Sequence, residues 1–175
     1  MLLEGEHLEP LSRSISVIVS REHHFTTDTI LLAAFSMPKS GDRCVDFGSG
    51  CGTIPFLWCS RANPQKVYAV ELQDSACSMA KRSVVLNGWE QRIEVCHQDL
   101  REFAEQKGLE LDVVACNPPY KADGAGLQNP EEAKRLARHE CSCTLEEIIA
   151  AAARVLRWGG KFFLCQRPER LCDVM

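Results

Sequence analysis

Four consecutive residues, Asn117-Pro118-Pro119-Tyr120, follow the apolar run 111–116 and have the types needed to bring a methyl group to a planar nitrogen. Such a nitrogen is a poor nucleophile because its lone pair is delocalised into a ring or a carbonyl. The side-chain amide oxygen of Asn117 and the carbonyl of Pro118 could accept its two hydrogens, and the prolines stiffen the turn in advance. Tyr120 offers a flat face for stacking. Alone, the tetrad could equally be a Pro-rich turn without chemistry.

A glycine motif lies well upstream of this tetrad. Asp46 ends an apolar run, and Gly48, Gly50 and Gly52 follow it before a segment that predicts a helix from residue 53. Glycines at this spacing let the backbone turn sharply and approach a ligand closely, as in nucleotide-binding βαβ units. An acid before the first glycine favours a cationic or zwitterionic amino-acid group over a pyrophosphate.

Two further acids follow predicted strands. Glu71, with Leu72 behind it, ends the run 66–71 about twenty residues beyond the glycines and could accept both ribose hydroxyls of an adenosine. Asp99, followed by Leu100, comes after the run 93–96 and is placed to meet an adenine amino group. Glycine motif, Glu71, Asp99 and the tetrad therefore occur in the order that one S-adenosylmethionine site requires.

These motifs resemble those of class I S-adenosylmethionine-dependent methyltransferases with an NPPY motif, and most of all the bacterial tRNA(Val) adenine-N6 methyltransferase family. The similarity covers nearly the whole chain and includes the flanking segments 25–32, 137–140, 159–163 and 167–170. It implies S-adenosylmethionine as cofactor and methylation of adenine N6 at anticodon-loop position 37 of tRNA. In this reading residues 117–120 are catalytic, and the cofactor-binding positions are Asp28, Asp46, Gly48, Gly50, Gly52, Glu71, Leu72, Asp99, Leu100 and Asn117.

Asp28 has two interpretations. The resemblance implies that it lies over the methionine end of the cofactor, but it could be only an acid that favours the start of a helix.

The distribution of charge bears on the substrate. The net charge is −4, but residues 134–170 carry 8 basic and 4 acidic side chains, whereas residues 1–133 carry 12 basic and 19 acidic ones. A positive region around the tetrad could hold phosphates, or these side chains could form solvated helix faces. Candidate RNA contacts near the tetrad are Lys121, Lys134, Arg135, Arg138 and His139.

Other functions fit the same motifs. Enzymes that methylate guanine N2 of rRNA, or a glutamine amide of release factors, also carry the NPPY tetrad. A methyltransferase-like binding module without activity is a third alternative. We favour tRNA because an anticodon-loop adenine is accessible to a compact enzyme, whereas a methyltransferase acting on duplex DNA usually needs a separate target-recognition domain.

Length and composition predict one cytoplasmic domain. The chain has 175 residues, of which 45% are hydrophobic and 25% charged, and no run in it has the length of a membrane span. Its ten cysteines are scattered without a CxxC pair, so we expect free thiols and no metal.

Alternating apolar runs and helical patterns predict an α/β Rossmann-like fold, a mostly parallel sheet with helices on both faces. Residues 1–36 form an N-terminal extension with a strand at 14–20 and a helix at 27–36, and residues 37–175 form the core. Core strands are expected near 43–47, 66–71, 92–96, 111–116 and 161–165. Helices are expected near 53–61, 74–87, 99–107 and 144–157, the last with a Thr144–Glu147 capping box and closed by Gly159-Gly160.

Two segments carry further expectations. The Gly- and Pro-rich stretch 119–132 beside the tetrad is typical of a substrate lid. Methyltransferases of this class have two more strands after the one at 161–165, so we expect a C-terminally truncated domain, whose last strand is an exposed edge able to pair with a second copy.

Overall fold

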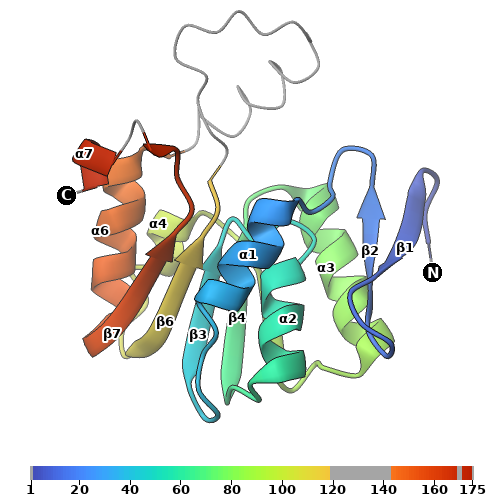
Figure 1. Ribbon diagram of the computed structural model, residues 1–175, viewed down its shortest axis with the longest axis horizontal. Coiled ribbons are helices and arrows are strands. Elements are labelled where there is room, and N and C mark those ends of the chain that lie inside the picture. The colour runs from blue at the N-terminus through green and yellow to red at the C-terminus, as the bar shows by residue number, and fades with distance from the viewer. Residues whose placement is uncertain (1, 119–142, 169–170, 175) are drawn as a thin grey trace, which may run out of the picture.

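The computed structural model describes residues 2–118, 143–168 and 171–174, and their centre is a five-stranded parallel sheet with helices on both faces (Figure 1). The strand order is β5-β4-β3-β6-β7, and β5 and β7 are the edges of this sheet. The strands are β3 (Arg43–Phe47), β4 (Lys66–Glu71), β5 (Ile93–His97), β6 (Leu111–Cys116) and β7 (Leu156–Leu164). Since helices cover both faces, the inner strands are mostly apolar and carry their charged residues near their ends, and the apolar runs are the pattern that predicted them.

The helices divide between the two faces of the sheet. One face is covered by α1 (Thr27–Phe35), α2 (Thr53–Arg61) and α3 (Asp74–Asn87), and the other by α4 (Leu100–Phe103) and α6 (Leu145–Val155). A short helix, α7 (Leu171–Val174), follows β7. The buried Trp58 and Phe56 of α2 pack on the first face, and Phe103 and Ile148 pack on the second. The predicted fold class and every predicted core strand and helix are thus found.

An antiparallel hairpin precedes the main sheet and packs on α3. Its strands are β1 (Glu6–Pro10) and β2 (Ser16–Ser20), and Glu6 pairs with Ser20 in register. The three central residues of β2 are apolar and buried, and the strand lies within the range 14–20 predicted for it. The first strand was not predicted, because its sequence EHLEP is largely polar and exposed.

The expected end of the helix at 144–157 is wrong. The capping box of Thr144 and Glu147 is present, but α6 ends at Val155 and β7 begins directly afterwards, so Gly159 and Gly160 lie within a strand. The register between β6 and β7 shifts here, and Gly159 has φ +78°. A Cβ on Gly160 would lie 2.9 Å from the carbonyl oxygen of Leu111, so glycine is required for the close approach of β7 to β6.

The helix expected at 99–107 is also shorter than predicted. It ends at Phe103, whose buried ring anchors it, because the exposed polar residues 105–107 offer no apolar face to bury.

Several cysteine side chains are part of the buried interior. All nine described cysteines are free thiols, and five of them are buried: Cys44, Cys51, Cys59, Cys77 and Cys116. Among the described residues, no cluster of three or more His, Cys, Asp and Glu side chains could hold a metal ion. Within the same ranges, no helix has the length and apolar character needed to cross a membrane.

Candidate functional site

The sheet register brings three of the predicted motifs together. Phe47, the last residue of β3, pairs with the penultimate residue of β4 on one side and with the last residue of β6 on the other. One position further along, Gly48 therefore lies between Glu71 and Asn117, at the end of the sheet where the carboxyl ends of the strands meet. The strand order reverses between β3 and β6, so this end is the switch point at which open α/β sheets bind ligands.

Side chains alternate between the two faces of the sheet along each strand, and this alternation places the predicted polar side chains on one face of the sheet. The residues two positions earlier in the same three strands pack in the hydrophobic cluster against α1 and α2: Cys44, Ala69 and Ala115. Because side chains two apart point the same way, Asp46, Glu71 and Asn117 project on the face covered by α1, α2 and α3. The alternation of side chains along each strand and the parallel register of the strands are sufficient to bring these three side chains together.

The glycine loop after β3 is open above Gly48 and Gly50. Their φ angles are +70° and +55°, and a Cβ added to either would meet no atom within 4 Å. The backbone N–H of Gly50 donates to Oε2 of Glu71 at 2.8 Å, which holds the loop against β4. A ligand can therefore approach the backbone here, as the sequence predicts.

Gly52 has a different environment. It caps the N-terminus of α2 with φ +87°, and a Cβ there would lie 3.2 Å from the Phe56 ring and 3.5 Å from Ala80. The requirement for glycine at this position is explained by its positive φ and by the close packing of Phe56.

Glu71 is 3% exposed and shapes the loop on both of its sides. Its Oε2 accepts the Gly50 N–H, and its Oε1 accepts the N–H of Gln73, both at 2.8 Å. Each carboxylate oxygen can accept two hydrogen bonds, so each retains capacity for one further donor. The predicted contact with a pair of ribose hydroxyls would use this capacity and stays a prediction.

Asp46 is the most deeply placed acid of the site. It is 2% exposed, and its Oδ1 has no hydrogen-bond partner within the described part of the chain. Burial, together with the nearby charge of Glu71, raises the pKa of Asp46 well above its usual value. A cation beside this carboxyl would relieve both effects.

A hollow opens between the ends of β3, β4 and β5. Its lining includes five residues of the predicted set, namely Gly48, Glu71, Leu72, Asp99 and Leu100, and three that were not predicted, namely Val70, Gln98 and Cys143. Nε2 of Gln98 is buried without a partner among the described residues. Gln98 adjoins the predicted acid and could have been found from the sequence, whereas no sequence signal places Cys143 here, 44 residues further on.

Asn117 is attached to the first turn of α1. Its Nδ2 donates to Oγ1 of Thr29 at 3.3 Å, and the same oxygen accepts the N–H of Thr26 in the capping box of the helix. Asp28 is exposed in that first turn and does not line the hollow. Thr29 was not predicted, because its contact depends on the tertiary position of α1.

Of the remaining predicted residues, the structure describes only Pro118. Pro118 is half-buried after β6. The rest of the tetrad, the expected lid 119–132 and the candidate RNA contacts lie outside the described residues: Pro119, Tyr120, Lys121, Lys134, Arg135, Arg138 and His139.

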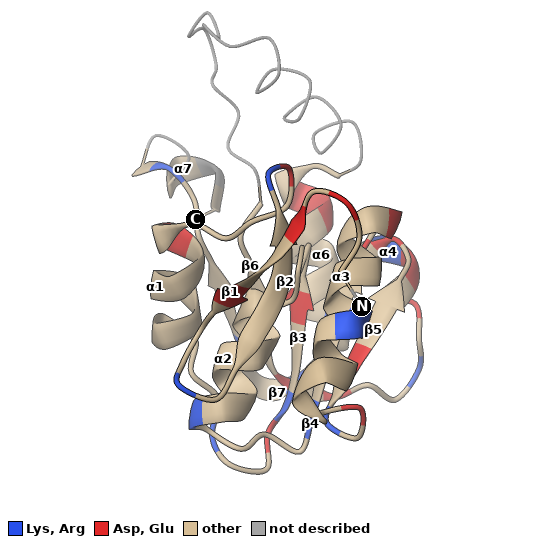
Figure 2. Cartoon of the chain, turned by 90° about the vertical axis from the view of Figure 1, so that its right-hand side faces the viewer, with Lys and Arg blue, Asp and Glu red and all other residues tan. Residues whose placement is uncertain are grey.

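Two described cations of the segment 134–170, Arg157 and Lys161, lie away from the glycine loop. Arg157 is the second residue of β7 and donates to the Asp112 carboxylate near the start of β6, so it lies at the amino ends of these strands, away from the glycine loop. Lys161 pairs with Val113 in the middle of β6. Figure 2 shows Lys and Arg positions scattered over the described chain. The reading of these two residues as part of a solvated surface is therefore favoured over a phosphate-binding role.

The residues present fit an adenosyl group that carries an amino-acid tail. Two buried acids face an open glycine loop, and one has an oxygen without a partner in the described structure. The hollow beside them offers the apolar Val70, Leu72 and Leu100 together with the polar Gln98 and Asp99. Such a lining suits a purine that needs both stacking and hydrogen bonds.

The chain matches the family model described as methyltransferase small domain over residues 17–172. The tRNA1(Val) (adenine(37)-N6)-methyltransferase of Bacteroides thetaiotaomicron is 33% identical over 137 residues, which is 78% of this chain and 56% of that protein. The enzyme of the same name from Yersinia pestis is 32% identical over 78% of this chain and 54% of its own length. The chain thus spans about half the length of these curated relatives.

The fold is also found in a solved structure, a SAM-dependent methyltransferase from Thiobacillus denitrificans in complex with S-adenosyl-L-homocysteine. It is 22% identical, and the match covers 81% of this chain and 49% of that protein with a TM-score of 0.57. The predicted class I methyltransferase fold is confirmed.

Proposed function

This chain belongs to the methyltransferase small-domain family, and from that premise we propose that it transfers a methyl group from S-adenosylmethionine to the N6 amine of an adenine in tRNA. The observation that carries the chemistry is the position of Asn117, which follows β6 next to the open glycine loop. The target is supported by the relatives whose name specifies adenine 37 of tRNA1(Val). The reaction would take place in the cytoplasm.

Each residue has a separate task in this proposal. S-adenosylmethionine supplies an electrophilic methyl group on a positively charged sulfur. The carboxyl of Asp46 compensates positive charge beside the glycine loop, and Glu71 accepts the ribose hydroxyls with the acceptor capacity that its two backbone contacts leave. Asp99 and Leu100 form the wall of the purine pocket.

Asn117 and Pro118 act on the substrate amine. Nδ2 of Asn117 is directed to Thr29, so its amide oxygen points the other way, and in this proposal that oxygen accepts a hydrogen of the amine. The carbonyl of Pro118 accepts the second hydrogen. These contacts favour the pyramidal nitrogen, whose lone pair would attack the methyl carbon in line while the carbon–sulfur bond breaks and S-adenosylhomocysteine leaves. The extra proton on the nitrogen is then lost to water.

Calorimetric titration of the 175-residue protein with S-adenosylmethionine tests the cofactor site. We expect saturable binding by the wild type and its loss in Asp46→Ala. An absence of binding by protein shown to be folded would contradict the proposal, since a methyltransferase must bind its methyl donor.

A transfer assay then tests the target. Unmodified tRNA1(Val) is incubated with the protein and radiolabelled S-adenosylmethionine, and its nucleosides are separated. Label in N6-methyladenosine that disappears when adenine 37 is replaced by guanine supports the proposal. Label in N2-methylguanosine, or in a protein glutamine when a release factor is supplied, would replace the proposed target with another.

A further inference from the structure

Asp99 is held by a single arginine at the edge of the hollow. It caps the N-terminus of α4, where its Oδ1 accepts the backbone N–H of Arg101 at 2.8 Å and the Nε–H at 3.0 Å. Its Oδ2 accepts Nη2 of the same arginine at 2.6 Å. This charge-assisted pair lowers the pKa of Asp99, so the carboxylate is ionised and fixed in one orientation.

The same guanidinium reaches the opposite wall of the hollow. Its Nη1 donates to Oε1 of Glu147 in α6 at 2.9 Å, and Oε2 of Glu147 accepts the backbone N–H of Thr144 at 2.7 Å. Thr144 directly follows Cys143, which lines the hollow. Arg101 thereby joins Asp99 to the beginning of α6, and it fixes the distance between two walls that are far apart in the sequence.

Counting acceptors shows which atom is left for a ligand. A carboxylate oxygen accepts two hydrogen bonds. Oδ1 of Asp99 already has two donors, whereas Oδ2 has one among the described residues. Oδ2 can therefore accept one hydrogen from a 6-amino group of a purine. A 6-oxo group at the same place would face the carboxylate with a second acceptor, which is repulsive.

We propose that Arg101 is a positioning residue that sets the preference of this pocket for a 6-aminopurine by fixing Oδ2 of Asp99 and the α6 wall. This rests on the proposed function in one respect, namely that the pocket takes the adenosine part of the cofactor. Arg101 does not line the hollow, so its effect is transmitted through Asp99 and Thr144.

A positioning role can be separated from a structural one at this site. Side-chain exposure is 44% for Arg101 and 39% for Glu147, and exposed ion pairs of this kind contribute little to stability. Loss of the arginine should therefore leave the folded state and its thermal midpoint nearly unchanged, while the selectivity of the pocket falls.

The experiment compares two ligands, S-adenosylhomocysteine and its deaminated analogue S-inosylhomocysteine, by calorimetry on the complete protein. For the wild type we expect about 10- to 100-fold tighter binding of the amino compound, the range of one hydrogen bond to a charged group. In Arg101→Gln the ratio should narrow to about threefold or less. Arg101→Lys keeps the charge but loses the bidentate geometry and should be intermediate. Arg61→Gln, an exposed arginine in the last turn of α2, is the matched control and should keep the wild-type ratio.

The outcomes are distinguishable. A ratio that collapses in Arg101→Gln alone supports the inference. An unchanged ratio in that variant, or an equal weakening of both ligands, overturns it and leaves the proposed function intact, as does a wild type without preference. A folded wild type that binds neither ligand overturns the proposed function and this inference together.

Discussion

Thr29 holds a position from which one hydroxyl can orient the amide of Asn117. Replacing it with Val removes the hydroxyl that accepts a hydrogen bond from Nδ2 at 3.3 Å and keeps the shape of the side chain. We expect kcat for methyl transfer to fall roughly 10- to 100-fold, because a misdirected amide no longer aligns the amine. Steady-state kinetics measures the loss, and calorimetry should show unchanged binding of S-adenosylhomocysteine.

Thr29→Ser retains the hydroxyl and is the matched control. Its kcat should lie close to that of the wild type. Equal activity of the Val and Ser variants would show that the hydroxyl has no part in orienting Asn117.

The buried carboxyl of Asp46 lowers the stability of the folded protein, because burial disfavours its ionised form. Asp46→Asn keeps the shape of the side chain and removes a buried acid whose ionised form is penalised by burial, so at pH 8 we expect the free energy of unfolding to rise by roughly 1–3 kcal/mol. Affinity for S-adenosylmethionine should fall in the same variant, because the compensating charge is lost. Urea denaturation and calorimetry measure the two effects.

The pH dependence of that gain follows from the direction of the shift. The pKa of Asp46 is raised in the folded state, so above its ordinary value of 3.8 the folded protein binds more protons than the unfolded chain, and wild-type stability falls as pH rises. The Asn variant lacks this contribution, so its advantage should be larger at pH 8 than at pH 4. An advantage that is constant across this range would contradict the assignment.

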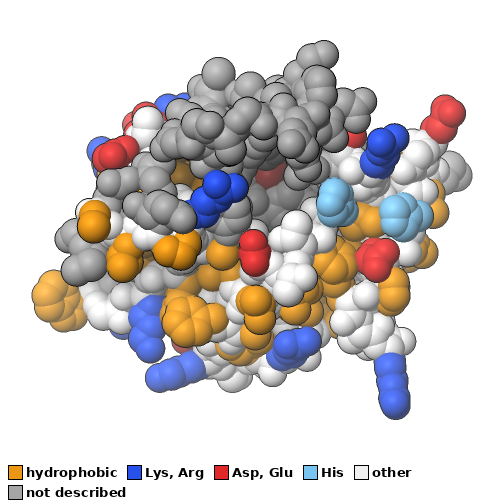
Figure 3. All heavy atoms as spheres, turned by 45° about the horizontal axis from the view of Figure 1, so that its top comes forward, with side chains coloured by type: hydrophobic (Ala, Val, Ile, Leu, Met, Phe, Trp, Pro, Cys, Tyr) orange, Lys and Arg blue, Asp and Glu red, His pale blue; other side chains and the backbone are white. Residues whose placement is uncertain are grey.

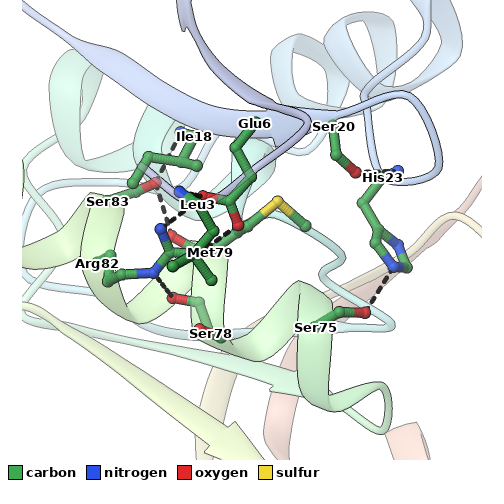
Figure 4. Close-up of polar contacts among 10 residues, drawn as sticks. All are labelled: Leu3, Glu6, Ile18, Ser20, His23, Ser75, Ser78, Met79, Arg82 and Ser83. Carbon is green, nitrogen blue, oxygen red and sulfur yellow. Dashed lines mark hydrogen bonds and ion pairs between the residues drawn. The ribbon is translucent and has the colours of Figure 1, made fainter. Parts of the chain in front are cut away.

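At the scale of elements, the hairpin is fastened to α3 by side chains along its whole length (Figure 4). The Arg82 guanidinium donates to both carboxylate oxygens of Glu6 at 2.6 and 2.7 Å. Oγ of the fully buried Ser83 accepts the N–H of Ile18 at 2.8 Å, and the Nε2 of His23 lies 2.8 Å from Oγ of Ser75. These contacts fix the hairpin and, through the chain after β2, the start of α1 that holds Asn117.

Ser83→Ala tests this attachment. The change leaves the buried N–H of Ile18 without its acceptor, so we expect the free energy of unfolding to fall by roughly 1–3 kcal/mol. Ser60→Ala is the matched control, since its exposed hydroxyl bonds only within α2 and should change stability by roughly 0.5 kcal/mol or less. Equal losses in urea denaturation would show that the hairpin is not held by this bond.

The elements also show what could be predicted from the sequence. The core strands were visible because each is an apolar run, and their parallel order followed from the motifs at their ends. The hairpin strand β1 was not visible, because its polar residues are stabilised by contacts with β2 and α3. The roles of Thr29 and Cys143 could not be predicted either, since each depends on where a distant helix begins. The expectation for Gly159 and Gly160 was wrong because glycine both ends helices and permits irregular strand pairing.

At the scale of the whole molecule, a ligand at the carboxyl end of the sheet would contact loops from several strands that meet only in the folded state. S-adenosylhomocysteine at 100 times its Kd should add about 2.7 kcal/mol to stability. For a chain of this size that raises Tm by roughly 5–10 °C. Thermal denaturation with and without ligand measures the shift, and Asp46→Ala should show a smaller one. An unchanged Tm at saturating ligand would contradict the placement of the site.

The surface of the molecule includes exposed hydrophobic side chains on α1. Leu31 and Phe35 of α1 are exposed, at 61% and 79%, and the Phe35 ring packs edge-on against Phe163 of β7 at 5.6 Å. Figure 3 shows hydrophobic side chains gathered across the front of this view, with Lys and Arg interspersed among them. The packing of Phe35 ties α1 to the edge strand, so the helix that holds Asn117 is supported from β7 as well as from the hairpin.

The five buried cysteines give the molecule a set of built-in reporters. They are distributed over β3, the glycine loop, α2, α3 and β6, and burial raises the pKa of several of their thiols, to about 12 for Cys59 and Cys77. A thiol that is both covered and protonated reacts with an alkylating reagent only while its segment is transiently open. Pulsed alkylation followed by mass spectrometry would therefore record the opening rate of each segment separately. Cys51 lies in the glycine loop and Cys116 ends β6, so both flank the proposed ligand site. Their labelling would measure how often this part of the protein opens locally, and no probe has to be introduced into the protein.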